Sequence, residues 1–319
     1  MARTETIRRE RADFESDGTR CAAWLYRPIE SASAGVGKPP VVVMGHGFGL
    51  TQEMCLPSIA ERFAERGLSV LTFDYRSLGD SDGVPRNVVD PFAQLDDWKA
   101  AVSHVRAMDD IDGDRLGVWG FSFGGGEALI TAAREDADAY VGQTPVYDGI
   151  RTVRYVVGQQ GPEYGLRMSA ASFKDLARKY ARREPYYIPI IGDAEEGEVV
   201  ALPSPGSKEG HEAMLPEEWG PEERAEWNRC AARVILQTGR YRPIKYADAV
   251  DCPAFVVEGT EDQLAPRSAI DATVSKLRDV NWVAYDTDHF GAFFGDLFEE
   301  VVEREGAFLE YHLLDAVRR

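Results

Sequence analysis

The sequence lacks the motifs by which proteins most often hold metals or nucleotides. Its four cysteines and five histidines form no C-x-x-C pair, no H-x-x-x-H helix motif and no mixed cluster, which argues against a zinc site. A G-x-x-x-x-G-K-[ST] phosphate loop is also absent, and Gly124-Gly125-Gly126 lacks the lysine that such a loop needs. We therefore expect neither a metal nor another cofactor.

Long hydrophobic stretches are missing as well. No apolar run approaches the length of a membrane-spanning helix, and the charged residues 1–10 are not followed by the hydrophobic stretch of a secretion signal. The cysteines are widely spaced, which is typical of buried or incidental thiols in a reducing compartment. They are Cys21, Cys55, Cys230 and Cys252. A cytoplasmic location is the resulting expectation.

Positive charge is scarce. The chain has 36 Lys and Arg residues against 54 Asp and Glu residues, so its net charge is −18 and we expect no binding to nucleic acid or anionic membranes. Acidic residues dominate positions 193–226, where prolines and glycines predict an exposed, solvated loop. The expected partner is a small-molecule substrate. Whether the chain is a monomer or a homodimer stays open.

The sequence does contain an alternation of short apolar runs and amphipathic segments. Alternation of this kind favours a mostly parallel sheet with helices on both faces. Strands are predicted at residues 6–14, 19–26, 41–44, 68–75, 116–119, 140–142, 254–257 and 280–285. Helices are predicted at residues 56–66, 92–108, 127–133, 268–278 and 296–317.

One segment of about 100 residues interrupts this alternation and is too long for a plain loop. We expect residues 1–147 and 250–319 to form the core domain. Residues 148–249 are expected to form a largely helical cap, inserted after the sixth strand over the carboxyl edge of the sheet. Aromatic residues of this segment could line a pocket or form the core of the cap, and the sequence favours neither. They are Tyr155, Tyr164, Tyr180, Tyr186, Tyr187, Trp219, Trp227 and Tyr241.

The pentapeptide Gly120-Phe121-Ser122-Phe123-Gly124 lies where a predicted strand changes into a predicted helix. A serine on such a tight turn presents its hydroxyl at the end of the sheet, as a nucleophile requires. The flanking glycines permit the close backbone approach of the turn. The alternative is an ordinary serine cap at a glycine-rich helix N-terminus.

Other groups suited to catalysis follow other predicted strands. His46 follows residues 41–44, Asp262 follows residues 254–257, and His289 follows residues 280–285. Because active sites of such sheets lie at the carboxyl ends of the strands, we expect these side chains to converge with Ser122.

Two of these assignments have competitors. His46 competes with His289 for the role of general base. The acidic partner is better assigned to Asp262, because it lies in a Gly-x-x-Asp sequence, than to three neighbouring carboxylates, which are Glu258, Glu261 and Asp288. Of the remaining histidines we expect structural roles in helices for His104 and His312, and solvent exposure in the acidic loop for His211.

Taken together, these pieces resemble the α/β-hydrolase fold over most of the chain except the cap, including the order Ser, Asp, His along the sequence. The stretch Gly79-Asp80-Ser81-Asp82-Gly83 and the N-terminal hairpin are similar to those of the dienelactone-hydrolase and X-Pro-peptidase branch. The matching segments are His46-Gly47, Phe73-Asp74-Tyr75-Arg76, the Ser122 turn, Gly259-x-x-Asp262 and Asp288-His289.

The resemblance implies a role for each residue. Ser122 is the nucleophile, His289 takes its proton as general base, and Asp262 orients the imidazole and stabilises its charged form. The backbone N–H groups of Phe48 and Phe123 would form the oxyanion hole. In this fold His46 would shape the oxyanion loop rather than act as base.

The sequence therefore predicts a serine hydrolase that cleaves a carboxylic ester or thioester through an acyl-enzyme on Ser122. An acyltransferase, a C–C bond hydrolase or a peptidase with the same three residues is the alternative. A catalytically inactive binding protein on the same fold is a further one. The acyl and leaving groups are expected to be selected by residues 148–249.

Overall fold

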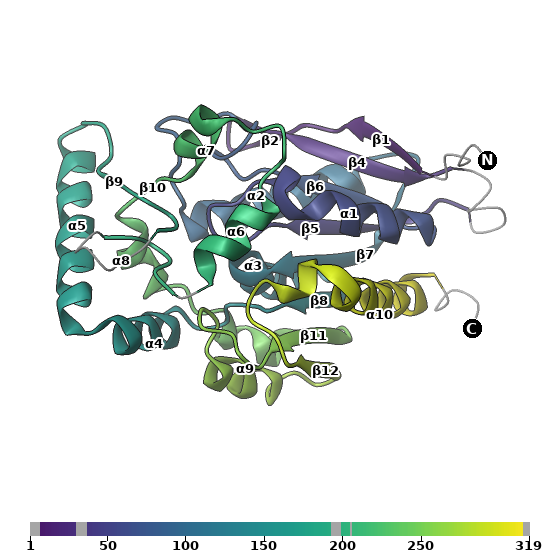
Figure 1. Cartoon of the computed structure of the whole chain (residues 1–319). Coiled ribbons are helices and arrows are strands. Elements are labelled where there is room, and N and C mark those ends of the chain that lie inside the picture. The colour runs from purple at the N-terminus through teal and green to yellow at the C-terminus, as the bar shows by residue number, and fades with distance from the viewer. Residues whose placement is uncertain (1–6, 30–36, 193–198, 205, 315–319) are drawn as a thin grey trace.

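The computed structural model describes residues 7–29, 37–192, 199–204 and 206–314 (Figure 1). Within them, eight strands form one main sheet in the spatial order β1-β4-β6-β5-β7-β8-β11-β12. Neighbours from β1 to β6 pair antiparallel, and all further neighbours pair parallel. The strands are β1 (Ile7–Arg11), β4 (Ala23–Pro28), β5 (Pro40–Gly45), β6 (Ser69–Phe73), β7 (Asp112–Phe121), β8 (Ala139–Gln143), β11 (Ala254–Gly259) and β12 (Val280–Tyr285). The mostly parallel sheet expected from the sequence is confirmed.

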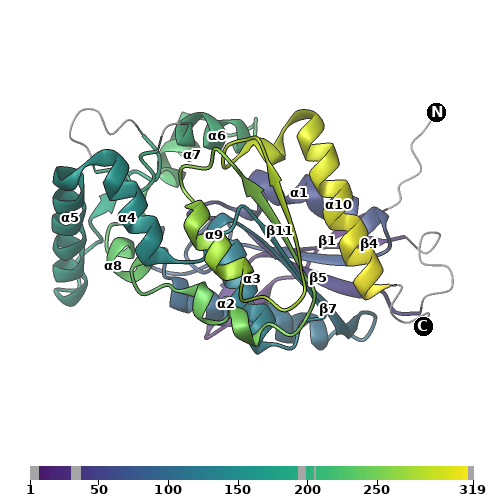
Figure 2. The same cartoon turned by 90° about the horizontal axis from the view of Figure 1, so that it is seen from below.

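Helices cover both faces of this sheet, which explains why β5 is apolar at nearly every position. On one face α1 (Gln52–Glu65) packs against α10 (Gly295–Leu313), and on the other α2 (Pro91–Arg106) packs against α3 (Ser122–Arg134) (Figure 2). A further helix, α9 (Arg267–Val274), contacts β11. The layered arrangement follows from the alternation of strands and helices along the chain.

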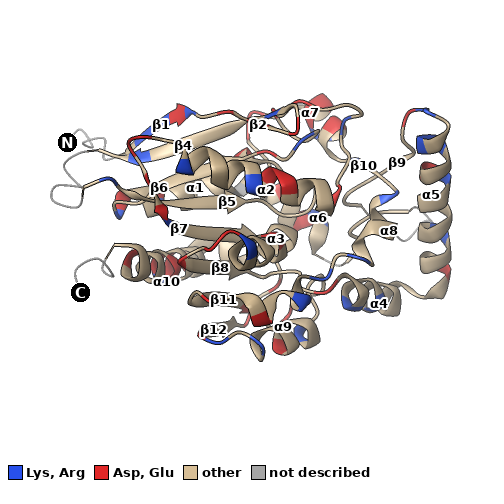
Figure 3. Cartoon of the chain, turned by 180° about the vertical axis from the view of Figure 1, so that it is seen from behind, with Lys and Arg blue, Asp and Glu red and all other residues tan. Residues whose placement is uncertain are grey.

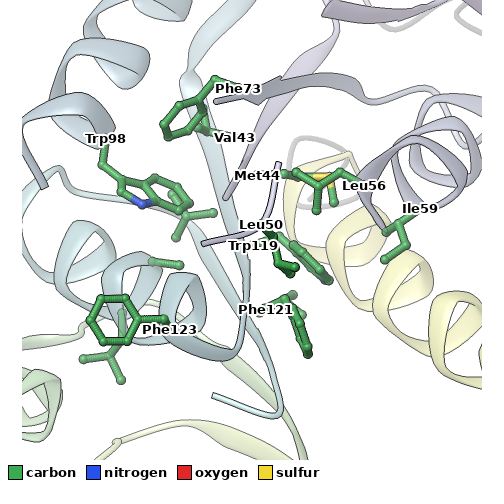
Figure 4. Close-up of a cluster of buried hydrophobic side chains, with 14 of the residues drawn as sticks. Val43, Met44, Leu50, Leu56, Ile59, Phe73, Trp98, Trp119, Phe121 and Phe123 are labelled. Atoms are coloured by element: carbon green, nitrogen blue, oxygen red, sulfur yellow. The ribbon is translucent and has the colours of Figure 1, made fainter. Parts of the chain in front are cut away.

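Large aromatic side chains fill the space between the sheet and the helices (Figure 4). Trp98 and Trp119 are fully buried, and their indole N–H groups donate to buried carboxyls. The donor–acceptor distance is 2.8 Å from Trp119 Nε1 to Glu305 and 3.3 Å from Trp98 Nε1 to Glu127. Burial raises the pKa of both carboxyls to about 8, so both are mostly protonated at neutral pH.

The N-terminal hairpin predicted from the sequence is present, but it is divided into two parts. The turn at Gly18, whose φ is 74°, joins two short strands, β2 (Phe14–Ser16) and β3 (Thr19–Cys21). Strands β1 and β4 continue the same antiparallel register, and between the two parts the carboxylate of Asp13 accepts from the backbone N–H of Ala23 at 3.0 Å. Residue 6, also placed in this strand by the sequence, lies outside the described residues.

The chain between β8 and β11 lies beyond the carboxyl edge of the sheet, at the opposite end of the molecule from the last turn of α10 (Figure 1). It contains the short strands β9 (Tyr187–Ile188) and β10 (Cys230–Ala231). Its helices are α4 (Gly149–Gln160), α5 (Pro162–Tyr180), α6 (Ser207–Met214), α7 (Pro221–Trp227) and α8 (Val234–Thr238).

The acidic stretch at residues 193–226 is exposed at its described acidic side chains, as predicted, but it is not all loop. The prediction of an exposed loop overlooked α6 and α7, which form there because their apolar residues pack inward, with Met214 and Trp227 buried. Residues 193–198 and 205 of this stretch lie outside the described residues, as do positions 315–317 of the predicted last helix.

The cysteine thiols of Cys21, Cys230 and Cys252 are free and buried, as expected. The side chain of Cys55 is not among those described. In the described ranges, no helix combines the length and apolarity needed to cross a membrane.

Candidate active site

Ser122 occupies a strained turn between β7 and α3. Its φ is 54°, in the left-handed region that a residue with a side chain rarely adopts. The turn is tight enough to require glycine on both sides. A Cβ on Gly120 would lie 2.2 Å from the carbonyl oxygen of Gly124, and a Cβ on Gly124 would lie 2.3 Å from the carbonyl oxygen of His46. This geometry holds the Ser122 hydroxyl at the carboxyl edge of the sheet.

The structure brings Ser122, His289 and Asp262 into one chain of hydrogen bonds. His289 Nε2 lies 2.8 Å from Ser122 Oγ, and His289 Nδ1 lies 2.6 Å from Asp262 Oδ2. The carboxylate of Asp262 can only accept, so His289 Nδ1 carries the proton and Nε2 is free to accept from the serine hydroxyl.

Asp262 is itself held in place by the backbone. Its second oxygen, Oδ1, accepts from the backbone N–H groups of Leu264 and Ala265 at 2.7 and 2.8 Å. Both Asp262 and His289 are buried. The carboxylate therefore has one fixed orientation and leaves only Oδ2 for the imidazole.

The three carboxylates that competed with Asp262 for the role of acid contact other groups or solvent. Glu258 accepts from the indole N–H of Trp282 at 3.0 Å. Asp288 Oδ1 accepts from the backbone N–H groups of Phe290 and Gly291 at 2.9 and 2.8 Å. The side chain of Glu261 is exposed. The assignment of the acid to Asp262 thus has the support of its contact with His289.

His46 lies buried beneath the loop that follows β5. Its Nδ1 is 3.0 Å from the carbonyl oxygen of Gly47, and its Nε2 is 3.8 Å from Asp74 Oδ1. Burial lowers the pKa of His46 to about 4, so the ring is neutral at physiological pH. The imidazole that accepts a hydrogen bond from the Ser122 hydroxyl is that of His289 instead.

The loop after β5 passes directly beside Ser122. A Cβ on Gly47 would lie 3.2 Å from Ser122 Cβ, and the rings of Phe48 and Phe123 meet edge to face at 5.8 Å. The N–H groups in the first turn of a helix have no acceptor within that helix, and Phe123 is in the first turn of α3. Phe48 and Phe123 also line the pocket into which Ser122 opens.

This pocket has a volume of about 540 Å³, within the range of small-molecule sites. Its walls are almost entirely apolar, and the described residues that line it include no Asp, Glu, Lys or Arg. Much of the lining comes from helices far along the chain from Ser122. Among them are Val153, Val156 and Val157 of α4, Tyr164, Leu166 and Met168 of α5, and Val234 and Ile235 of α8.

The sequence did not single out these aliphatic residues. Only the spacing of Val153, Val156 and Val157 on one helical face was a signal, and it equally fits a helix that packs in a core. The sequence left open whether the aromatic residues of the 148–249 segment line a pocket or form a core, and both occur. Tyr164 lines the pocket, whereas Tyr241 supports it from below, stacked on Phe123 at 4.2 Å.

His211 is a correction, because the sequence placed it in solvent. It is buried at the pocket wall, where its ring lies 4.7 Å from that of Phe290 and its Nδ1 is 2.6 Å from the carbonyl oxygen of Ser207. Burial lowers the pKa of His211 to about 4. His104 and His312 lie in α2 and α10, as predicted.

Metal ligands are not gathered anywhere in the described part of the chain. No group of three or more His, Cys, Asp or Glu side chains there could hold a metal ion.

Known proteins are similar to this chain over nearly its whole length. The chain is 33% identical over 298 residues to the quorum-quenching protein AidA of Acinetobacter baumannii (strain MDR-ZJ06), covering 93% of each protein. It is 26% identical over 325 aligned positions to the polyketide transferase af380 of Aspergillus fumigatus, covering 96% of this chain and 99% of that protein. The structure of DcsB with its substrate analogue has a TM-score of 0.78 at 24% identity, covers 96% of this chain and 99% of that one, and shares the fold.

A family model agrees with these relatives. The model described as Alpha/beta hydrolase family matches residues 41–304, which include the strands that precede Ser122, Asp262 and His289. The chain therefore belongs to the alpha/beta hydrolase family.

Proposed function

We propose that this protein is a serine hydrolase that removes an apolar acyl group from a carboxylic ester or thioester through an acyl-enzyme on Ser122. One observation carries the proposal. The hydrogen-bonded chain of Ser122, His289 and Asp262 opens into an apolar pocket of about 540 Å³. The activated serine therefore lies in the wall of a cavity that is large enough for an acyl group.

The proposed reaction has two halves. As Ser122 Oγ attacks the substrate carbonyl, its proton passes to His289 Nε2, which is 2.8 Å away. The tetrahedral intermediate then collapses, the C–O or C–S bond breaks, and the leaving group takes the proton from His289. A water molecule, deprotonated by His289, attacks the acyl carbon, and the acid is released while Ser122 regains its proton.

The fixed carboxylate of Asp262 makes this proton transfer favourable. It accepts from His289 Nδ1 and stabilises the imidazolium while the intermediate exists. The negative charge on the former carbonyl oxygen needs two N–H donors. We assign these to the backbone of Phe48 and Phe123, each of which is expected to contribute about 3 kcal/mol to transition-state stabilisation.

The acyl group is proposed to lie between α4, α5 and α8. No charged side chain of the described residues lines the pocket, so an acyl chain gains from burial whereas a charged one would lose its hydration there. Residues 148–249 would then act as a cap that selects the acyl group, over a core formed by residues 1–147 and 250–319.

A direct test is turnover of p-nitrophenyl esters from acetyl to dodecanoyl by the wild type and by Ser122→Ala. We expect the wild type to prefer acyl chains of intermediate length and Ser122→Ala to lose at least about 10⁴-fold in kcat. A fluorophosphonate should label Ser122 in the wild type. Full turnover by a folded Ser122→Ala, or labelling of another residue, would refute the assignment.

Acyl transfer is the second candidate, because the apolar lining of the pocket disfavours bound water and the relative af380 bears the name polyketide transferase. Adding an alcohol or amine acceptor to the ester assay separates the two. A transferase would form the new ester or amide faster than the free acid.

A peptidase is less well supported. An aminopeptidase needs carboxylates to hold the free amine of its substrate, and the apolar pocket itself has no Asp or Glu among the described residues that line it. Glu261 and Asp288 line a smaller adjoining pocket, which also includes His289. The likeness to dienelactone hydrolases and X-Pro peptidases, a C–C bond hydrolase activity and the cytoplasmic location all stay predictions.

A further inference from the structure

The outer face of α5 carries an exposed apolar stripe. Leu166, Phe173 and Tyr180 are 72%, 60% and 81% exposed, three of the eight large exposed hydrophobic residues in the described part of the chain. They are spaced by seven residues, and Ala170 and Ala177, also exposed, lie between them. Together the five positions form a heptad pattern of the kind that pairs two helices.

From Ala170 onward the stripe faces away from the rest of the molecule, while Leu166 at its start lies at the mouth of the pocket. The opposite face of α5 is already buried, with Tyr164, Met168 and Ala171 turned inward. Figures 1 and 2 show α5 as the outermost helix, next to α4 and α8. The stripe is thus a second apolar face on a helix whose packing within this chain is complete.

Charge is distributed unevenly along α5 (Figure 3). Glu163 lies in the first turn, where it pairs with Arg167 at 2.9 Å, whereas Lys179 lies in the last turn and is followed by the exposed Arg182 and Arg183. A copy of the helix that runs in the opposite direction would therefore bring the exposed Glu163 to the basic end.

The basic side chains in the middle of the helix are held by their own chain. Lys174 Nζ lies 3.7 Å from the ring centre of Tyr186. Arg178 Nε donates to the carbonyl oxygen of Glu184 at 2.6 Å. These contacts draw positive charge away from the stripe and reduce repulsion between two copies at its centre.

We propose that two copies of this chain associate through antiparallel α5 helices, with a twofold axis beside Phe173. Leu166 is seven residues before Phe173 and Tyr180 is seven after it, so each Leu166 would contact the Tyr180 of the second copy. Glu163 would likewise face Arg182 and Arg183. An isologous contact of this kind closes on itself and forms a dimer, not a filament.

The size of the contact sets its strength. The 19 residues of α5 extend over about 28 Å, so one helix pair buries less surface than a standard stable interface. We expect a dissociation constant on the order of 1–10 μM.

Dimer formation would also change the mouth of the pocket and thereby the binding of substrate. This consequence rests on the proposed function. Leu166 and Ser169 line the pocket as well as belonging to the outer part of α5. The Tyr180 side chain from the second copy would cover Leu166 at the mouth of the pocket. The monomer is therefore expected to retain short-ester turnover and to show a higher KM for long acyl chains.

Sedimentation velocity of the full chain between 1 and 100 μM tests the proposal. We expect the wild type to shift from monomer to dimer over this range, and Phe173→Glu to stay monomeric with an unchanged circular dichroism spectrum. The matched control is Val84→Glu, which places the same charge on another exposed apolar position, 93% exposed and outside α5. It should dimerise like the wild type.

A charge exchange gives a second, independent readout. Glu163→Lys and Arg183→Glu should each weaken the dimer, about tenfold, and a mixture of the two variants should associate more tightly than either alone. A wild type that is monomeric at 100 μM, or a Phe173→Glu that still dimerises, would overturn the proposal. So would a monomer whose stripe binds phosphatidylglycerol vesicles instead. Loss of esterase activity in the wild type would refute the proposed function while leaving the dimer intact.

Discussion

The core and the 148–249 segment contribute to the same pocket in different ways. The core presents Ser122, Asp262 and His289, each at the end of a strand and each fixed by backbone geometry or by short hydrogen bonds. The 148–249 segment presents mainly aliphatic side chains from short helices. A sheet can position reacting atoms to within fractions of an ångström, whereas an apolar wall needs only the right volume. Changes in the core should therefore alter rate, and changes in the helices should alter preference.

Asp262→Asn should produce the largest effect of the changes compared here, a loss of about 10⁴-fold in kcat/KM. Because Oδ1 would still accept from Leu264 and Ala265, the new amide NH₂ would face His289 Nδ1 and favour the wrong tautomer. The measurement is kcat/KM for p-nitrophenyl hexanoate. Glu261→Gln, an exposed neighbour, serves as control and should keep wild-type activity. Equal activity of both variants would mean that Asp262 does not orient the base.

Two glycine substitutions compare the regions directly. Gly124→Ala places a Cβ 2.3 Å from the carbonyl oxygen of His46, so we expect at least a tenfold loss of activity and a lower midpoint in urea unfolding. Gly158→Ala in α4 meets nothing within 4 Å and should stabilise the protein by about 0.5–1 kcal/mol. If the two variants had similar activity and similar unfolding midpoints, the turn at Ser122 would be no more sensitive to an added Cβ than helix α4.

Val156→Phe tests whether α4 selects the acyl group. The larger side chain would occupy part of the pocket, so KM for p-nitrophenyl decanoate should rise about tenfold while acetyl ester turnover stays unchanged. The readout is the ratio of kcat/KM for the two esters. An equal loss on both would indicate general damage to packing and would remove α4 from the specificity determinants.

The smallest expected effect concerns a core carboxyl remote from the chemistry. Burial raises the folded-state pKa of Glu305 to about 8 from an ordinary value of 4.5. The unfolded chain therefore loses this proton first, and the contribution of Glu305 to stability falls as pH rises from about 4.5 to about 8.

Glu305→Gln should abolish that part of the pH dependence. Relative to the wild type, the variant should be more stable in urea unfolding at pH 7.5 than at pH 5, because its amide stays neutral at both. An identical difference at the two pH values would show that Glu305 does not titrate in this window. Ester turnover should not change, because Glu305 accepts a hydrogen bond from Trp119 and does not contact Ser122, Asp262 or His289.

The reactive groups could be predicted because neighbouring strands of a parallel sheet end at one edge. Ser122, Asp262 and His289 each follow an apolar run, so local patterns and the sheet rule together were enough to place them near one another. The pocket could not be predicted in the same way. Val156, Met168 and Val234 are ordinary aliphatic residues, and nothing local distinguishes a residue that lines a cavity from one that fills a core.

His211 shows that local composition can also predict the exposure of a side chain wrongly. Its acidic and proline-containing neighbours predicted solvent, yet contacts with Phe290 and Trp227, both distant in sequence, bury it. Composition describes the average environment of a segment. Burial of one side chain depends on which other elements pack against it.

The sequence by itself determined the alternation of strands and helices, the tight turn at Ser122, and the placement of an acid and a histidine after later strands, because these features depend on neighbouring residues and on the period of the backbone. Only the tertiary structure decided that Asp262 rather than Glu258 or Asp288 contacts His289, and that helices beyond β8 enclose an apolar pocket. Those outcomes depend on distances between segments tens to hundreds of residues apart, and packing sets such distances.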